Sequence, residues 1–395
     1  MRICIVVDDY MPHSTKIAAK MMHDLAKGFL TLGHKVVVVT PGPELNKPYE
    51  ITDLDGVRIY RFRSGQIKNV SKIKRAINES LLSWRAWRAL RKIFNEESNE
   101  LILYYSPSIF WGPLINKLKK LWKARSYLVL RDFFPQWAID NGLLGKNSLI
   151  TKYFKFFESL NYRSADRIGI QSPKNLEWFQ TQFARRKGTE VLYNWAENSS
   201  NNSKTNFKSY RSTLGLDGKV VFFYGGNIGH AQDMSNIVRL AENVKEYPKA
   251  HFLLIGSGDE VELVRDSVQR KSLNNLTLLD PVSQDEFKRI LAEFDIGLFS
   301  LHKNHQTHNF PGKVLGYMVE GMPILGCVNP GNDLKDVIEN AKAGFVSVSG
   351  EDSLLKENAI RLMDESLRNS MGLNAKKLLE DRFSISSAMS QILDV

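Results

Sequence analysis

The sequence predicts an α/β fold with two doubly wound domains of the Rossmann-like type. Apolar, strand-like runs alternate with amphipathic helical runs along nearly the whole chain. A polar stretch at 198–208, which has no apolar periodicity, interrupts this alternation once. Strands that alternate with helices are typical of βαβ units and a parallel sheet. We therefore expect one domain at 1–197 and a second at 209–379.

The length and composition are those of a folded, water-soluble protein. The chain has 395 residues, enough for two domains, with 43% hydrophobic and 25% charged residues. We find no leader peptide and no apolar run long enough to span a membrane. Cys4 and Cys327 both lie in apolar strand-like runs, which favours buried, reduced thiols and a cytoplasmic setting.

Charge is distributed unevenly along the chain. Residues 1–195 contain 32 lysines and arginines against 17 acidic residues, whereas the remainder contains 22 against 26. A basic half beside a slightly acidic half indicates that one half faces an anionic partner. Nucleic acid and a membrane surface are the two classes of partner that this asymmetry suggests.

The first half opens as a βαβ unit. An apolar strand at 3–7 is followed by a loop, a helix at about 16–32 and a second, β-branched strand. Ligands of such sheets bind at the carboxyl ends of the strands. We therefore expect Asp9 and the 10–16 loop, which contains His13, to lie near a site.

The stretch at 68–94 combines apolar residues at helical spacing with eight basic residues and one acid, Glu79. A second basic run at 117–125 surrounds Trp122. Basic amphipathic helices with tryptophan suit an anionic membrane interface. The alternative interpretation is a pair of surface helices that pack on the sheet and expose a solvated basic face.

A later strand of the first half, at 127–130, ends in Arg131 and Asp132. A guanidinium and a carboxylate at the carboxyl end of a strand are well placed for a site, and they are equally compatible with a structural ion pair.

In the second half, residues 308–327 predict a loop, a short helix, a turn and a strand. Asn309 suits the N-cap, Pro311 the first helical turn and Gly321 the C-terminal stop. The N–H groups of the first turn together with Lys313 predict a site for phosphate or diphosphate. The alternative is a capped core helix with a solvated lysine.

Two glycine turns follow strands of the second half, at 225–229 and 256–258. Glycine allows the backbone to approach a ligand closely. Because Val261 stands where a dinucleotide fingerprint requires glycine or alanine, we reject that motif. The two turns and Lys313 together predict a nucleoside diphosphate site, although tight βα turns need glycine in any case.

Three histidines, His302, His305 and His308, are spaced by three residues in a polar loop. This spacing suggests a metal site, but no cysteine or carboxylate lies nearby and the frame of a known zinc motif is absent. We predict no metal and no cofactor, and we assign these histidines instead to possible contacts with a phosphate or a sugar.

These features occur in an order that is similar to that of one enzyme family. The residues that carry the similarity are 33–36, Arg131, Asp132, Pro135, Asn194, 226–229, 256–258, Asp295, 311–315 and 321–323. With them, the chain resembles retaining nucleotide-sugar glycosyltransferases of the GT-B fold, in glycosyltransferase family 4. Residues 309–313 and 226–229 look most like those of bacterial O-antigen and capsule enzymes, in particular transferases of N-acetyl-L-fucosamine or related aminosugars.

The resemblance implies a cleft between the two domains, with a last helix near 380–395 that returns to the first domain. It also implies a UDP-sugar donor, a lipid-diphosphate-linked saccharide acceptor and an enzyme at the cytoplasmic face of the bacterial inner membrane. Transfer would retain the anomeric configuration and would need no obligatory metal.

Site roles follow from the same resemblance. Lys313 would stabilise the leaving diphosphate, and Asp132 would orient or deprotonate the acceptor hydroxyl. Asp9, His13 and Arg131 would lie on the acceptor side. The donor-binding residues would be Gly226, Asn227, Gly229, Gly256, Gly258, His308, Asn309, Phe310, Pro311 and Gly312.

The chain departs from the family pattern at the sugar and ribose. Many members carry two glutamates eight residues apart, and here these positions hold His308 and Gly316; His230 replaces a usual arginine. Two alternatives stay open at this point. One is a non-hydrolysing UDP-sugar epimerase of the same fold, and the other is a non-catalytic nucleotide- or lipid-binding partner of a synthase complex. A nucleic-acid binder would explain the basic half but not the glycine turns, so we predict no nucleic-acid partner.

Overall fold

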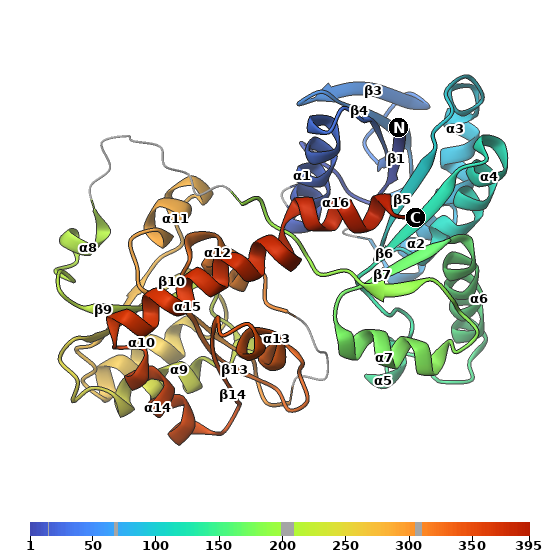
Figure 1. The fold of residues 1–395 in the computed structure, drawn as a ribbon. Helices are drawn as coiled ribbons and strands as arrows, with labels where there is room; N and C mark the ends of the chain where they lie inside the picture. Colours follow the sequence, from blue (N-terminus) through green and yellow to red (C-terminus); the bar gives the residue numbers. More distant parts are fainter. Residues whose placement is uncertain (15, 67–69, 199–208, 305–309) are drawn as a thin grey trace. The chain divides into compact units, whose positions relative to one another are not determined.

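The computed structural model describes residues 1–14, 16–66, 70–198, 209–304 and 310–395. The expected linker therefore lies, apart from residue 198, outside the described residues, as do His305, His308 and Asn309. The chain forms two compact units, which we call unit 1 (Met1–Tyr193 with Ile385–Val395) and unit 2 (Asn194–Ser384). Figure 1 shows the elements of both.

Within its described residues, unit 1 is built on one eight-stranded sheet in the order β3-β4-β2-β1-β5-β6-β7-β8. The strands are β1 (Arg2–Val6), β2 (Lys35–Gly42), β3 (Tyr49–Leu54), β4 (Val57–Arg63), β5 (Leu101–Ser106), β6 (Arg125–Leu130), β7 (Arg167–Ile170) and β8 (Thr189–Val191). All neighbours are parallel except β3 and β4, which form an antiparallel hairpin. The sequence patterns did not predict this hairpin.

Helices cover both faces of this sheet. They are α1 (Ile17–Thr31), α2 (Lys72–Ser80), α3 (Leu82–Glu96), η1 (Ile109–Trp111), α4 (Gly112–Trp122), α5 (Gln136–Asp140), α6 (Leu149–Ser164), α7 (Pro173–Gln182) and α16 (Ile385–Leu393). The last of these, α16, packs on α1. The two helices approach closely at Gly28, because a Cβ added there would lie 2.7 Å from Ile385 Cγ2. Strands β2 and β5 flank β1 on opposite sides, so the direction of winding reverses at the β1–β5 pair.

The basic stretch at 68–94 contributes two helices rather than one. One face of α3 is buried in the core through Leu82, Ala86, Leu90 and Phe94. The Trp122 indole donates a hydrogen bond to Phe94 O at 2.7 Å, and the Trp87 ring stacks on Phe94. Trp84, in contrast, is 53% exposed. The interpretation that these helices pack on the sheet therefore explains Trp87 and Trp122, but it does not explain Trp84.

Within its described residues, unit 2 is built on one six-stranded, fully parallel sheet in the order β11-β10-β9-β12-β13-β14. The strands are β9 (Val220–Asn227), β10 (Ala250–Ser257), β11 (Leu276–Leu279), β12 (Ile296–Ser300), β13 (Ile324–Val328) and β14 (Gly344–Val348). The helices are α8 (Tyr210–Thr213), η2 (His230–Gln232), α9 (Met234–Asn243), α10 (Val261–Arg270), α11 (Gln284–Leu291), α12 (Lys313–Glu320), α13 (Leu334–Asn340), α14 (Asp352–Arg361), α15 (Glu365–Leu378) and the π-helix η3 (Leu379–Phe383).

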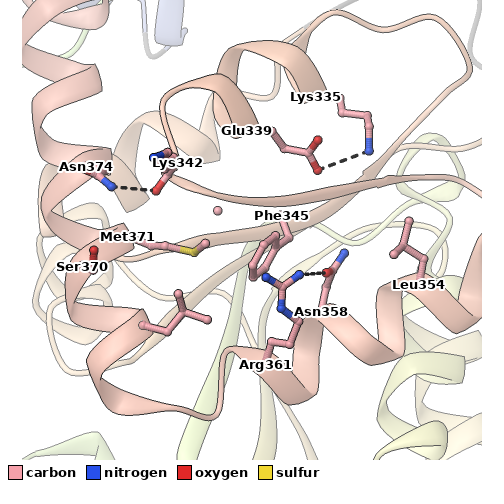
Figure 2. Close-up of a pocket in the computed structure, with 12 residues that line it drawn as sticks. Lys335, Glu339, Lys342, Phe345, Leu354, Asn358, Arg361, Ser370, Met371 and Asn374 are labelled. Carbon is pink, nitrogen blue, oxygen red and sulfur yellow. Dashed lines mark hydrogen bonds and ion pairs between the residues drawn. The ribbon is translucent and has the colours of Figure 1, made fainter.

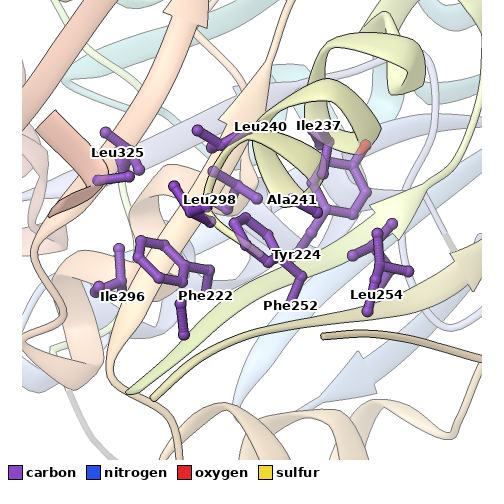
Figure 3. Close-up of a cluster of buried hydrophobic side chains, with 14 of the residues drawn as sticks. Phe222, Tyr224, Ile237, Leu240, Ala241, Phe252, Leu254, Ile296, Leu298 and Leu325 are labelled. Carbon is purple, nitrogen blue, oxygen red and sulfur yellow. The ribbon is translucent and has the colours of Figure 1, made fainter. Parts of the chain in front are cut away.

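The core of unit 2 lies between β9, β10 and the helix α9 (Figure 3). The Phe222 and Phe252 rings of neighbouring strands stack with their centroids 4.8 Å apart. Strands β10 and β12 flank β9 on opposite sides, so the winding reverses at the β9–β12 pair. The carboxyl ends of these two strands are where a ligand of a doubly wound sheet is expected.

Two sheets of parallel strands covered by helices confirm the predicted fold class. Two local predictions are confirmed as well, because Gly321 ends α12 with a φ of 68° and both cysteines are buried thiols. The predicted start of α12 is wrong: its N-cap is Gly312 and its first residue is Lys313, so Pro311 precedes the helix. Every helix in the described part of the chain is too short or too polar to cross a bilayer.

Candidate functional site

The amine of Lys313 is buried without a hydrogen-bond partner among the described residues. Its Nζ is enclosed, and among the described residues no atom forms a hydrogen bond with it. The amine lies 3.3 Å from the centroid of the Tyr224 ring. Burial lowers the pKa of Lys313 well below its usual value, because the charged form loses its hydration there. A buried amine that has no acceptor is poised to meet an anion.

The packing of α12 determines where this amine lies. Tyr317, one turn into the helix, is buried and its hydroxyl donates to Leu298 O of β12 at 2.8 Å. A Cβ at Gly297 would lie 2.2 Å from Tyr317 Cγ, so only glycine admits the ring at this point. With α12 seated on β12, its first residue lies over the end of β9, the neighbouring strand.

The two glycine turns touch each other and Lys313. Gly226 has a φ of 118°, a conformation that L side chains rarely adopt, and a Cβ there would be 3.9 Å from Lys313 Cε. A Cβ at Gly256 would lie 1.8 Å from Gly226 O. Glycine at both positions therefore lets the ends of β9 and β10 approach one another beside the lysine.

Backbone hydrogen bonds fix the turn that follows β9. Ile228 N–H donates to Ser257 O at 2.9 Å, and Glu260 N–H donates to Ile228 O at 3.0 Å. A Cβ at Gly258 would be 2.1 Å from Ile228 O and 3.0 Å from the Asn227 amide oxygen. The Tyr224 hydroxyl donates to Asn227 O, so the ring under Lys313 also supports the turn.

Acidic residues that the sequence patterns did not single out support the same turn. Asp259 Oδ1 lies 2.5 Å from the Cβ position of Gly229 and accepts from His230 N–H at 3.3 Å. Glu260 Oε2 accepts from Met234 N–H at 3.1 Å, which satisfies the N-terminus of α9. Their positions in the sequence were a signal for these two roles, since Asp259 and Glu260 come immediately after the glycine turn that ends at Gly258.

The loop before α12 is described from Phe310 onward. The Phe310 ring lies 6.3 Å from that of Phe383 between centroids. A Cβ at Gly312 would meet no described atom within 4 Å. The His230 ring lies 4.8 Å from that of His302, the one member of the histidine series that is described. In the described part of the chain, no three His, Cys, Asp or Glu side chains gather in a way that could hold a metal.

Unit 1 contains a cavity of about 390 Å³ at the carboxyl ends of β1 and β2, and the two predicted acceptor-side residues Asp9 and His13 line it. The other lining residues are Asp8, Tyr10, Pro41, Gly42, Pro43, Glu44, Leu45, Glu50, Arg61 and Gln66. Burial raises the pKa of Asp8 to about 6, against the opposing effect of Lys16. Acidic residues outnumber basic ones in the lining, with Asp8, Asp9, Glu44 and Glu50 against Arg61.

Buried polar contacts hold the loop that forms one wall of this cavity. Arg61 donates to Tyr10 O at 3.4 Å and to Met11 O. The Tyr10 hydroxyl and His23 Nδ1 are 2.9 Å apart, and His23 Nε2 lies 3.0 Å from Asp55 Oδ2. Asp9 forms an ion pair of 3.2 Å with Lys16.

Asp132 lies after β6 in an environment that favours its neutral form. Burial raises the pKa of Asp132 to about 6, although its carboxylate accepts hydrogen bonds from the Trp137 indole and from Phe134 N–H. Tyr105 of β5 feels the charges of both Asp8 and Asp132, and burial raises its pKa to about 12. Asp8, after β1, and Asp132, after β6, thus both lie near Tyr105, and both have a pKa raised to about 6.

Arg131 is positioned differently from its neighbour. Its guanidinium donates to three backbone carbonyl oxygens: Leu130 at 3.1 Å, Gly169 at 3.3 Å and Tyr193 at 3.1 Å. Burial lowers the pKa of Arg131 to about 10. These bonds connect β6 and β7 to the segment after β8, so the described contacts of Arg131 hold the sheet end together.

A second cavity, of about 500 Å³, lies in unit 2 between α13, β14, α14 and α15 (Figure 2). Two of its three lining cations have partners: Lys335 pairs with Glu339 at 3.3 Å, and Arg361 lies 4.1 Å above the Phe345 ring. None of the residues predicted for the site lines this cavity in the described part of the chain.

Both halves of the chain match known protein families. Residues 181–378 match the family described as Glycosyl transferases group 1, and residues 18–195 match the Glycosyl transferase 4-like domain.

Two curated proteins are similar over much of their length. A protein named as a colanic acid biosynthesis glycosyl transferase, WcaI of Escherichia coli K12, is 21% identical over 81% of this chain and 82% of its own. A protein named as a glycosyltransferase, WbjE of Pseudomonas aeruginosa, is 24% identical over 65% of this chain and 64% of its own. Among solved structures, Anabaena HepE in complex with UDP and glucose matches with a TM-score of 0.63 at 15% identity, over 100% of this chain and 98% of its own.

Proposed function

Because the chain belongs to the glycosyl transferases group 1 family, and is thus a glycosyltransferase with a GT-B fold, we propose that it transfers a sugar from UDP to a lipid-linked acceptor with retention of configuration. The proposed sugar is an (amino)deoxyhexose such as N-acetyl-L-fucosamine. The proposed acceptor is a saccharide on a lipid diphosphate, and the proposed process is bacterial O-antigen or capsule synthesis.

The single observation that carries the donor proposal is the buried amine of Lys313 beside the Gly226 turn, which has no hydrogen-bond acceptor in the described part of the chain. It lies where the winding of the unit 2 sheet reverses, which is where such sheets bind phosphorylated ligands. A diphosphate would supply the missing acceptors and a compensating negative charge. HepE was crystallised with UDP, and this supports uridine as the nucleoside of the donor.

Departure of UDP is the difficult step for such a transfer. Negative charge develops on the diphosphate as the bond from the anomeric carbon to the β-phosphate oxygen breaks. Lys313, in its protonated form, and the N–H groups at the glycine turns would stabilise that charge without having to reorganise. The resemblance implies that Pro311 and Gly312 approach the donor, and the open space at Gly312 is compatible with this role.

On the acceptor side, the chemistry of the unit 1 cavity favours sugar hydroxyls over phosphates. Asp8, Asp9, Glu44 and Glu50 supply carboxylates that accept hydrogen bonds from hydroxyl groups and repel phosphate. We therefore assign the saccharide of the acceptor, rather than its diphosphate, to this cavity. Asp132 is our candidate for the group that takes the proton of the attacking hydroxyl, because its raised pKa suits a general base near neutral pH.

The process is inferred from the relatives. WcaI is named as a glycosyl transferase of colanic acid biosynthesis, and this supports a role in the synthesis of a bacterial polysaccharide. We assign this chain to the same class of reaction, at the cytoplasmic face of the inner membrane.

The test is release of UDP from a panel of UDP-hexosamines that includes L-fucosamine and L-quinovosamine types. It is run with and without a lipid-diphosphate monosaccharide. We expect release that requires the acceptor, produces a lipid-linked disaccharide and disappears in Lys313→Ala.

Other outcomes would change the assignment. Interconversion of the UDP-sugar in the absence of acceptor would replace transfer by epimerisation. Turnover with GDP- or dTDP-sugars but with none of the UDP-sugars would overturn the proposed donor.

A further inference from the structure

Unit 1 carries an exposed apolar face that none of the residues assigned to the donor or the acceptor explains. It consists of Ile77, Trp137, Leu143, Leu149, Ile150, Tyr153 and Phe156, and we call it the α5–α6 face. Leu149 is 84% exposed, and Leu143 and Phe156 are each 63% exposed. Large apolar side chains gathered in this way on a water-soluble protein mark a surface that binds something.

Contacts between its elements make the face continuous. Tyr153 of α6 donates a hydrogen bond from its hydroxyl to Ser80 Oγ of α2 at 2.7 Å, which places α2 and Ile77 beside α6. The Phe134 ring connects α5 to α6, because its centroid lies 6.0 Å from that of Trp137 in α5 and 4.8 Å from that of the buried Phe154 in α6. Figure 1 shows α5 and α6 in the same part of unit 1.

The outward side chains stand on a rigid base. Ser148 caps α6 by accepting from Thr151 N–H at 3.2 Å, and the Thr151 hydroxyl donates to Gly145 O at 2.8 Å. Phe154 is buried against Phe110 on the opposite side of the helix. With Phe154 directed inward, residues 149, 153 and 156 form one outward stripe at helical spacing.

The charges that flank the stripe select the partner. Lys146, Lys152 and Lys155 are all exposed around it, whereas the nearby Glu79 of α2 is paired with Arg75 at 2.8 Å. Asp140 is the exposed acid of α5. A symmetric contact with a second copy would bring these lysines toward one another, which is unfavourable. Apolar and aromatic side chains surrounded by lysines suit an anionic bilayer, where the rings enter the headgroup layer and the lysines meet lipid phosphates.

We propose that the α5–α6 face is the surface through which this protein docks on an anionic membrane. This inference rests on the proposed function, since it supplies the route to a lipid-linked acceptor. Trp137 belongs to the face, and its indole donates to the carboxylate of Asp132. Docking would therefore bring the bilayer surface to the immediate neighbour of the candidate base.

The test is flotation of the full chain with vesicles of phosphatidylcholine, alone or mixed with phosphatidylglycerol. We expect binding to the mixed vesicles that weakens as salt is raised. The double variant Leu149→Gln, Phe156→Gln should bind at least about tenfold more weakly, because two apolar side chains no longer enter the bilayer. Lys152→Gln with Lys155→Gln should also weaken binding and should reduce its dependence on salt. Leu373→Gln, which alters a 70% exposed leucine of α15, is the matched control and should bind like the wild type.

The same variants separate this inference from the proposed function. We expect the Leu149, Phe156 double variant to keep wild-type turnover with a water-soluble acceptor analogue and to lose it with acceptor in vesicles. Wild-type vesicle binding by the double variant would overturn the docking surface even if transfer proceeds. A change from dimer to monomer in that variant, with vesicle binding retained, would assign the face to self-association instead. Absence of sugar transfer alongside the expected vesicle binding would count against the proposed function alone.

Discussion

Lys313 and Tyr224 come from distant parts of the unit 2 sequence, yet the lysine amine lies 3.3 Å from the centroid of the tyrosine ring. The ring face is electron-rich and attracts a cation, but it cannot replace the hydrogen bonds of water. Among the described residues the amine has no other partner, and its pKa is lowered. The arrangement therefore leaves a buried lysine amine, which has no hydrogen-bond acceptor among the described residues, near the carboxyl end of β9.

Replacement of Lys313 by methionine should separate function from stability. We expect turnover to fall by about 10²–10³, as when one preorganised donor to a developing anion is removed. The free energy of unfolding should stay the same or rise, because a buried polar atom without a partner disappears. Steady-state kinetics and thermal unfolding measure the two effects. Lys303→Met, which changes an exposed lysine of the preceding loop, is the control. A large loss of stability in Lys313→Met would contradict this account.

Binding of UDP should be accompanied by uptake of a proton. Burial lowers the pKa of Lys313 in the free protein, and a bound diphosphate would raise it again by stabilising the charged form. Isothermal titration calorimetry in buffers of different ionisation enthalpy gives the number of protons taken up. We expect the wild type to take up protons over a range of pH below the usual pKa of lysine, and Lys313→Met to take up fewer. Equal proton uptake by both proteins would exclude Lys313 as the group that titrates.

The pH dependence of transfer should have an acidic limb near pH 6. The raised pKa of Asp132, about 6, means that its carboxyl group is protonated at a higher pH than an ordinary aspartate. A base must be ionised, so kcat/KM should be constant above pH 7 and should fall as the pH drops through 6. Because Asp8 also titrates near 6, the profile alone does not assign the limb.

The variant Asp132→Asn shows whether the acidic limb of the pH profile belongs to Asp132. We expect a loss of kcat of about 10²–10⁴ if Asp132 is the base. The raised pKa also has a consequence for folding, since the native state binds this proton more tightly than the unfolded chain. Asp132 therefore lowers stability above pH 6, and this penalty disappears as the pH falls below 4. Asp132→Asn should relieve the penalty at neutral pH. Full activity in Asp132→Asn would move the role of the base to Asp8.

The contact between the two glycine turns should be sensitive to a single methyl group. In Gly256→Ala, the new Cβ would lie 1.8 Å from Gly226 O, so the ends of β9 and β10 must separate. We expect a loss of stability of about 1–3 kcal/mol, typical of overpacking, together with weaker UDP binding. Chemical denaturation and calorimetry measure these effects. In the control Gly145→Ala, the nearest described atom is 3.8 Å away, and both quantities should be unchanged.

Local rules of chain geometry account for most of what could be predicted. The alternation of apolar runs predicted most strands of both sheets, although not β11, and the βαβ rule predicted that they would be parallel. The hairpin β3–β4 was missed because its pattern, with Asp55 and Gly56 at the turn, lies in a polar segment between two stronger strands. The start of α12 was misplaced because Asn309 and Pro311 satisfy the rules for a helix start, whereas the N-cap lies three residues after Asn309, at Gly312.

The sequence by itself determined the fold class, and it made the glycine turns and Lys313 the candidates for a site, because each of these inferences depends on neighbours along the chain. The tertiary structure alone decided the environment of these residues. It placed the Tyr224 ring against Lys313. It also turned Arg131 toward three carbonyl oxygens, and it buried Asp132, which raises the pKa of that carboxyl group. It also left Leu149 and Phe156 exposed. The physical reason is that periodicity tells which residues share one face of a helix, whereas only the packed chain tells whether that face meets protein or solvent.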